Sequence, residues 1–251
     1  MLKIINSGCT GKMGQVVQAM CAADPDVTIV AGFASHQANL DYPVYTNPAN
    51  FTGEADVVID FSNPKALGHL LPFCVERRIP IVIATTGFSP EQLAQIDEAA
   101  KTIPVFRSAN MSLGINVLLE LVKKAASILG SSSDIEIVER HHNRKVDAPS
   151  GTALLLFDAI KNAYDEPRYA QLGRGGRSCK RQHNEIGIHA LRGGTVTGEH
   201  EVCFFGPAER IRLSHSAEDR SVFASGVLKA AAYLQGKAPG RYTMEDLVAG
   251  R

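Results

Sequence analysis

The sequence has no excess of charge of either sign and no long hydrophobic run. Its 26 Lys and Arg residues equal its 26 Asp and Glu residues, so the formal net charge is zero. A chain with this balance has no overall basic field to hold nucleic acid or an anionic membrane surface. The longest stretch without a charged residue is Val27–Leu40, fourteen residues, whereas a transmembrane helix needs about 20 mostly apolar residues. We therefore expect no nucleic-acid partner and no membrane span.

Cysteine is scarce, and its spacing excludes a disulfide framework. The chain has five cysteines, an odd number, with no Cys-x-x-Cys pair. The apolar run Leu2–Ser7 leads directly into Gly8 and leaves no room for a signal peptide. We therefore predict a cytoplasmic protein. Its cysteines are expected to be reduced and mostly buried packing residues, namely Cys9, Cys21, Cys74, Cys179 and Cys203.

The first half of the chain alternates predicted strands and helices. With 251 residues, 45% of them hydrophobic, the chain is an ordinary globular protein long enough for two modest domains. One helix is expected after Ser62-Asn63-Pro64 and another from Ser89-Pro90-Glu91, while residues 34–55 look like a loop. This alternation predicts an α/β domain with a doubly wound parallel sheet. Its predicted strands are Leu2–Ser7, Val27–Phe33, Asp56–Phe61, Pro80–Ala84 and Pro104–Arg107.

After Asn110 the pattern changes to that of an α+β domain. Gly193-Gly194 lies between two strand-like runs and predicts a β-hairpin. The basic, apolar-poor segment Glu166–Asn184 is expected to be a mobile loop, and a helix at Ser221–Gln235 could return to cover the first domain. We predict a mixed or antiparallel sheet and two domains: residues 1–112 with 217–251 for the dinucleotide, and 113–216 for substrate and oligomerisation. The predicted elements of the second domain are helices Leu113–Leu129 and Ser150–Ala163 and strands Asp134–His141, Glu185–Arg192, Thr195–Phe205 and Arg210–Ser216.

A glycine triplet joins the first strand to the first helix. Gly8, Gly11 and Gly14 stand where glycines let the backbone approach a pyrophosphate, which the free N–H groups of a helix start then bind. The pattern indicates a Rossmann-type dinucleotide site, although tight strand-to-helix turns also use glycine for steric reasons alone. The acidic residue that would bind a ribose 2′-hydroxyl about 20 residues on is missing, and Ser35 and His36 stand there instead. These two side chains either contact a 2′-phosphate or are merely solvated.

The segment Glu139–Ala153 is the most informative in the chain. It brings His141, His142 and Lys145 together at the end of a strand, and Ser150-Gly151-Thr152 then opens a helix that offers a second anion site. This local positive charge on a neutral chain predicts an anionic small substrate, most simply a carboxylate. Adjacent histidines point in different directions, so a metal site is not expected. A Ser-His-Asp hydrolase built from Ser150, His141 and Asp147 remains conceivable, but the chain lacks a Gly-x-Ser-x-Gly elbow.

Taken together, the motifs closely resemble the dihydrodipicolinate reductase family over nearly the full length. The resemblance is carried by the glycine loop, Ala84–Phe88, Ser108–Ser112, Glu139–Ala153 and Arg192–His200. It implies reduction of 4-hydroxy-tetrahydrodipicolinate by NADH or NADPH on the diaminopimelate route to lysine, in a homotetramer formed through the sheet of the second domain.

The resemblance also implies a role for individual residues. It makes His141 the acid/base residue and Lys145 the proton donor, with His142, Gly151 and Thr152 binding a substrate carboxylate. The implied cofactor-binding residues are Gly8, Cys9, Thr10, Gly11, Lys12, Met13, Ser35, His36, Ala84, Thr85, Thr86, Ser108, Ala109, Asn110 and Met111. Some members have an acidic-basic pair where this chain has Ser35-His36, which leaves the preference between NADH and NADPH open. Two alternatives remain at this stage: another NAD(P)-dependent dehydrogenase, and a non-catalytic regulator that senses dinucleotides.

Overall fold

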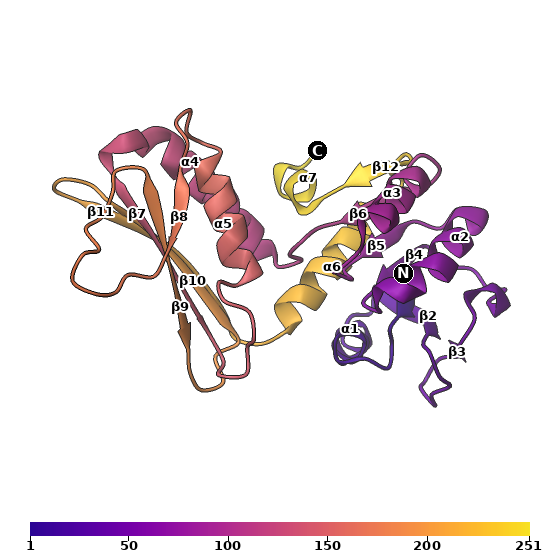
Figure 1. The fold of residues 1–251 in the computed structure, drawn as a ribbon. Coiled ribbons are helices and arrows are strands. Elements are labelled where there is room, and N and C mark those ends of the chain that lie inside the picture. Colours follow the sequence, from indigo (N-terminus) through magenta and orange to yellow (C-terminus); the bar gives the residue numbers. More distant parts are fainter. The chain divides into compact units, whose positions relative to one another are not determined.

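The computed structural model describes residues 1–251, apart from the side chain of Ser131. The chain forms two compact units (Figure 1). Unit 1 consists of Met1–Leu113 together with Arg220–Arg251, and unit 2 consists of Gly114–Asp219. Unit 2 is therefore inserted into unit 1 along the sequence.

Unit 1 is built on a parallel sheet, which confirms the predicted fold class. The strand order across the sheet is β12-β6-β5-β4-β1-β2-β3, and the chain order reverses between β1 and β4, as in a doubly wound sheet. The carboxyl ends of β1 and β4 are neighbours in this arrangement, so the loops after them can form one site. The strands are β1 (Leu2–Ser7), β2 (Val27–Phe33), β3 (Val44–Tyr45), β4 (Val57–Asp60), β5 (Ile81–Ile83), β6 (Pro104–Arg107) and β12 (Gly240–Tyr242).

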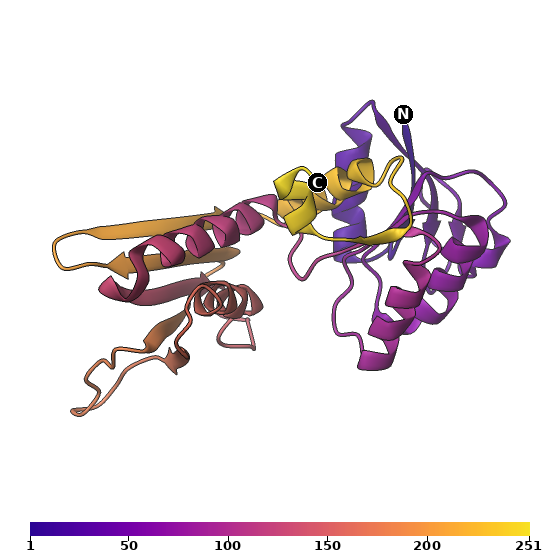
Figure 2. The same ribbon diagram turned by 90° about the horizontal axis from the view of Figure 1, so that it is seen from above.

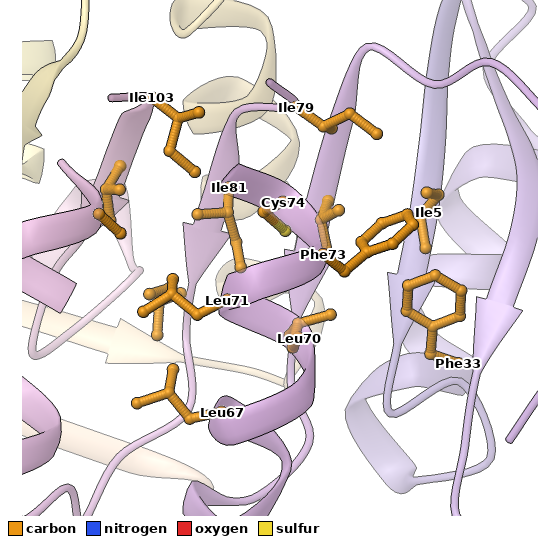
Figure 3. Close-up of a cluster of buried hydrophobic side chains, with 14 of the residues drawn as sticks. Ile5, Phe33, Leu67, Leu70, Leu71, Phe73, Cys74, Ile79, Ile81 and Ile103 are labelled. Atoms are coloured by element: carbon orange, nitrogen blue, oxygen red, sulfur yellow. The ribbon is translucent and has the colours of Figure 1, made fainter. Parts of the chain in front are cut away.

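Helices cover both faces of this sheet because its central strands are buried on both sides. Ile5, Val58 and Ile81 pack against α2 (Leu67–Arg77) and α3 (Pro90–Ala99). Figure 3 shows this cluster, in which Phe73 of α2 lies close to Phe33 of β2. The opposite side chains, such as Ile4 and Val57, pack against α1 (Lys12–Ala22), α6 (Ser221–Tyr233) and α7 (Met244–Ala249). The predicted return of the C-terminal helix to the first domain is thus confirmed.

Unit 2 is a mixed sheet with two helices on one face (Figures 1 and 2). Its strand order is β11-β10-β7-β9-β8. Ile135, Ile137 and Val202 point to the covered face and pack against the helices, while the opposite face carries more polar side chains. The elements are α4 (Leu113–Leu129), β7 (Asp134–His141), α5 (Gly151–Lys161), β8 (Tyr169–Leu172), β9 (Glu185–Arg192), β10 (Gly198–Phe205) and β11 (Arg210–Ala217).

The hairpin predicted around Gly193-Gly194 is wrong. β9 and β10 do not pair with each other, because β7 lies between them, parallel to β9 and antiparallel to β10. The connection between them passes over the end of β7, where the N–H of Gly193 donates to the carbonyl of His141 and the N–H of His142 donates to the carbonyl of Val196. The glycines therefore shape a crossing loop beside the candidate site.

Two segments expected to be loops contain regular structure. The segment 34–55 includes strand β3 and the 3₁₀ helix Pro48–Asn50, and Glu166–Asn184 includes the edge strand β8. Arg174 and Arg181, in the second segment, form ion pairs with Glu185, which contradicts the expected mobile loop. Two further 3₁₀ helices, Pro64–Ala66 and Gly130–Ser132, complete the described elements.

Candidate active site

The glycine turn of unit 1 leaves no room for larger residues. Gly8 has a φ of +80°, and a Cβ there would lie 2.7 Å from the carbonyl oxygen of Phe61. A Cβ on Gly14 would lie 2.3 Å from the carbonyl oxygen of Gly8. Steric hindrance thus requires glycine at both positions. This agrees with the interpretation that a tight strand-to-helix turn uses glycine for steric reasons.

The same turn also presents an anion site. Helix α1 begins after Gly11, and within the described chain no side chain caps it and no acidic residue occupies its first turn. The first N–H groups of a helix have no intrahelical acceptor, and the helix dipole adds partial positive charge there. The start of α1 is therefore suited to bind a phosphate.

Two cavities open at this edge of unit 1, and Phe61 lines both of them. The first has a volume of about 500 Å³, and the second has a volume of about 380 Å³. Ser7, Gly8, Thr10, Gly11, Ser35, Asn63, Lys65 and His69 are among the residues around the first cavity. The second is lined by Met13, Phe61, Ala84, Ser108, Ala109, Asn110, Met111, Arg220 and Phe223.

These linings gather most of the predicted cofactor residues, but not all. Cys9, Lys12, His36, Thr85 and Thr86 line neither cavity in the part of the chain that the structure describes. The side chain of Cys9 is fully buried and turned toward Gly32, where a Cβ would lie 2.7 Å from its Sγ atom. Sequence reasoning missed the lining residues Phe61, Asn63, Lys65, His69, Arg220 and Phe223; of these, a motif marked only Asn63, as part of a helix start.

Asp60 joins three strand ends beneath these cavities. It is the last residue of β4 and is buried, with its Oδ1 atom accepting from Ser7 Oγ at 2.8 Å and from Ser62 Oγ at 2.6 Å. Its Oδ2 atom accepts from Thr85 Oγ1 at 2.7 Å. Burial raises the pKa of Asp60, and the hydrogen bonds from Ser62, Thr85 and Ser7 offset part of that rise. Thr85 therefore has a structural role as a hydrogen-bond donor to Asp60. The sequence signal for this role was Asp60 itself, a charged residue at the end of an apolar strand.

The second set of candidate residues lies in unit 2, where β7 ends. His141 is the last residue of β7 and is 9% exposed, on the same face of the strand as Glu139. Its Nδ1 atom lies 2.6 Å from Glu139 Oε2. Arg192, the last residue of the neighbouring strand β9, forms a bidentate ion pair with both oxygens of Glu139 at 2.7 Å. Glu139 and His141 belong to the segment Glu139–Ala153 and Arg192 to the separate stretch Arg192–His200, and no sequence pattern indicated that Glu139 connects the other two.

Ser150 has a different partner from the one a hydrolase requires. Its Oγ atom caps α5 by accepting from the amide of Ala153 and lies 2.9 Å from Nε2 of His200 on β10. Burial lowers the pKa of His200 to about 4, so this imidazole is neutral near pH 7. Asp147 pairs with Lys145 rather than with a histidine. The Ser150–His141–Asp147 arrangement is therefore contradicted.

Two of the predicted substrate residues form the start of α5, and His142 and Lys145 lie in the segment between β7 and this helix. Lys145 lies in the loop after β7, and its side chain is 20% exposed and in contact with Asp147. Gly151 and Thr152 form the first turn of α5, where within the described chain no acidic residue stands and Gly151 is exposed. Positive charge, exposed amides and a histidine pair thus occur at one end of the unit 2 sheet, which suits a carboxylate ligand.

The described residues form neither a metal-binding cluster nor a membrane-spanning helix. Among the described residues, no three His, Cys, Asp or Glu side chains come together as a metal-binding group. No helix in the described chain has the length and apolar character needed to cross a membrane. Of the described cysteines, all are free thiols and only Cys179 is exposed, which confirms that they are mostly buried residues.

Comparison with known proteins identifies relatives over the whole chain. The family model described as "Dihydrodipicolinate reductase, N-terminus" matches residues 2–111, and "Dihydrodipicolinate reductase, C-terminus" matches residues 114–248. The chain is 54% identical to the 4-hydroxy-tetrahydrodipicolinate reductase of Caldanaerobacter subterraneus subsp. tengcongensis, covering 99% of this chain and 98% of the relative. It is 49% identical to the enzyme of the same name from Clostridium novyi, with 99% and 98% covered.

A solved structure shows the same fold. It is a dipicolinate-bound dihydrodipicolinate reductase from Paenisporosarcina sp. TG-14, with a TM-score of 0.79, 24% identity and 97% of each chain covered. At that identity the likeness supports the fold alone.

Proposed function

Because the chain belongs to the dihydrodipicolinate reductase family, we propose that unit 1 binds the dinucleotide, and that His141 and Lys145 of unit 2 serve the chemistry. The protein is an oxidoreductase that reduces 4-hydroxy-tetrahydrodipicolinate with NADH or NADPH, in the diaminopimelate pathway to lysine. A regulator without activity, or a dehydrogenase of another family, no longer fits.

The chemistry requires a proton donor near the substrate. Conversion of 4-hydroxy-tetrahydrodipicolinate to tetrahydrodipicolinate replaces a C–OH group by C–H, so one hydride is added and the hydroxyl leaves as water with one proton. The nicotinamide cofactor supplies the hydride when it is bound. His141 and Lys145 are the proton-exchanging groups of this region, and such general acid catalysis typically contributes about 10²–10⁴-fold.

The substrate is a dicarboxylate, and the start of α5 is suited to one of its carboxylates. Amide N–H groups at Gly151 and Thr152 and the nearby charge of Lys145 complement this anion, with His142 as a further donor. The solved structure of the same fold from Paenisporosarcina sp. TG-14 is described as dipicolinate-bound, and dipicolinate is itself a dicarboxylate.

The residues of unit 1 fit a dinucleotide. Gly8 and Gly14 form a turn that any Cβ would fill, and the uncapped start of α1 offers amides to a pyrophosphate. The first cavity, with Ser35, would take the adenosine part, and the second, with Ala84 and Ser108–Met111, the nicotinamide part.

We also propose a homotetramer in the cytoplasm. The face of the unit 2 sheet opposite its helices carries Leu191 and Phe205, which are 47% and 37% exposed, beside Val138. Exposed apolar side chains among charged ones such as Glu136 and Arg174 are typical of a surface that associates with other copies. The buried free thiols agree with a reducing compartment. Sedimentation at micromolar concentration tests the proposal, and a monomer would contradict it.

The observation that carries the proposed roles is the placement of His141 and Lys145 beside the start of α5. Binding of pyridine-2,6-dicarboxylate, measured by calorimetry, and NADPH oxidation, followed at 340 nm with freshly made substrate, test them separately. His142→Ala should weaken dicarboxylate binding, whereas His141→Ala should chiefly lower kcat. Unchanged binding and turnover in both variants would place the site elsewhere.

A further inference from the structure

Glu139 is a buried carboxylate whose two oxygens each have two donors. Its Oε2 atom faces His141 Nδ1 at 2.6 Å and Arg192 Nη1 at 2.7 Å, and its Oε1 atom accepts from Arg192 Nη2 at 2.7 Å and from the amide of Ser150 at 3.0 Å. The residue is fully buried. Burial favours a raised pKa for Glu139, but the hydrogen bonds from Arg192, His141 and Ser150 outweigh it and lower the pKa. The carboxylate is therefore ionised and acts only as an acceptor.

An ionised acceptor at this distance fixes which nitrogen of His141 bears hydrogen. The Nδ1 atom must donate to Glu139, so in the neutral imidazole Nε2 has the free lone pair. The space beside Nε2 is kept by Gly198 on β10, where a Cβ would lie 3.0 Å from that atom. Nε2 is therefore the nitrogen that remains for proton exchange.

Arg192 and His200 stabilise the contact between Glu139 and His141, and neither of them replaces His141 in that contact. Arg192 balances the charge of Glu139, so no unpaired charge is buried. His200 packs edge-on against His141, with ring centroids 5.2 Å apart, and bonds Ser150 rather than Glu139. The ring of His141 is thus held from β7, β9, β10 and the start of α5.

We propose that Glu139, held by Arg192, is the positioning residue that keeps His141 in the Nδ1–H tautomer with Nε2 available for proton exchange with the substrate. The proposal rests on the role proposed above for His141. It also gives a function to Arg192, which would orient Glu139 without touching the substrate.

The opposite face of the same strand offers a matched control. Glu136 holds Nε2 of His189 at 2.7 Å and pairs with Arg174, so it makes the same kinds of contact as Glu139 but away from His141. Glu136→Gln and Glu139→Gln therefore remove equivalent charges from one strand.

The test compares both variants by steady-state kinetics, thermal unfolding and ¹⁵N NMR of the histidine rings. Glu139→Gln should lower kcat at least tenfold with less than a threefold change in substrate KM. An amide can turn its NH₂ group toward the ring, so the Nδ1–H form of His141 should lose its dominance. Glu139→Asp should restore part of kcat, and Glu136→Gln should keep kcat within about twofold.

Each outcome decides the proposal. If Glu139→Gln retains kcat and the wild-type ring spectrum, or if both variants lose kcat equally, Glu139 has no specific positioning role. If Glu139→Gln does not fold, the wild-type spectrum decides, since an Nε2–H tautomer of neutral His141 would overturn the proposal. Loss of the His141 role itself would appear separately, as near-normal kcat in His141→Ala.

Discussion

The Nζ atom of Lys145 lies 2.8 Å from Oδ1 of Asp147, two residues further along the same loop. The hydrogen bond from Lys145 lowers the pKa of Asp147, so this carboxylate stays ionised and holds the ammonium group in the loop. The side chain of Lys145 is only 20% exposed. The proposed proton donor is therefore already oriented before a substrate arrives.

Replacing either proposed proton-exchanging residue should reduce turnover while the fold survives. We expect Lys145→Ala and His141→Ala each to lower kcat by about 10²–10⁴-fold. Lys145→Ala should change the free energy of unfolding by less than about 1 kcal/mol, because its ion pair with Asp147 is partly exposed. Lys161→Ala is the control, since it removes a similar pair with Asp158 on α5. Steady-state kinetics and denaturant titration measure both effects, and near-wild-type kcat in both site variants would refute the assignment.

The start of α5 should discriminate substrate from cofactor. A Cβ added at Gly151 meets no atom of the described chain within 4 Å, so Gly151→Ala should fold normally and obstruct only a bound ligand. Thr152→Val removes a hydroxyl at the same helix turn. Each change should raise the substrate KM by about tenfold, equivalent to ~1.4 kcal/mol, and leave the cofactor KM nearly unchanged. Kinetics with each ligand varied in turn would show a misplaced site if the two KM values rise together.

The preference between cofactors should depend on charge around the first cavity. Among the described residues around it are Ser35, Lys65 and His69, but no carboxylate, so nothing there repels a 2′-phosphate. We expect NADPH to be used at least as well as NADH. Ser35→Glu should shift the ratio of kcat/KM toward NADH by about tenfold for each ~1.4 kcal/mol of discrimination. Lys65→Ala should weaken binding of adenosine 2′,5′-bisphosphate more than that of 5′-AMP.

The control for Ser35→Glu and Lys65→Ala is Lys101→Ala. Lys101 pairs with Glu98 and, in the described chain, lines neither cavity. A strong wild-type preference for NADH would refute the prediction. So would an unchanged cofactor ratio in Ser35→Glu.

Mild acid should destabilise the protein through His200. Burial lowers its pKa from the ordinary 6.5 to about 4, so between these values the unfolded chain binds a proton that the folded chain does not. Stability therefore falls as the pH decreases from 6.5 to 4, by up to about 3 kcal/mol at ~1.4 kcal/mol per pH unit. His200→Asn should flatten this part of the curve of unfolding free energy against pH. His183→Gln, an exposed change in the same unit, should not, and equal curves for all three proteins would disprove the prediction.

Local patterns were sufficient for most elements, but pairing and side-chain connections were not. The bounds of β1, β2, β7 and α4 match the runs expected from periodicity and β-branching, because each element buries one or both faces throughout its length. The strands on either side of Gly193-Gly194 do not pair with each other, because β7 pairs with both of them. β7 ends 44 positions before β9 begins (185 − 141), so no local pattern reveals this pairing. Short edge strands such as β3 have too few residues to show a period.

In the candidate site, too, local patterns predicted residues close in sequence but not the contacts between distant ones. Motif spacing indicated His141, Lys145 and the helix start, which are close in sequence. It could not reveal that Arg192 reaches Glu139 across 53 positions, or that Asp60 collects donors from Ser7 and Thr85. These connections depend on strand order, which no local pattern contains.

The insertion of unit 2 into unit 1 has a consequence for biosynthesis. Helix α6 and Met244 supply one wall of the core that encloses Ile4 and Val17. While the chain is still on the ribosome, these early side chains have no partner from α6 until residues beyond Ser221 have emerged. The continuous segment Gly114–Asp219 can complete its own core sooner. Vectorial synthesis therefore favours folding of the inserted unit first, and the dinucleotide-binding unit closes its core only after α6 and Met244 have emerged.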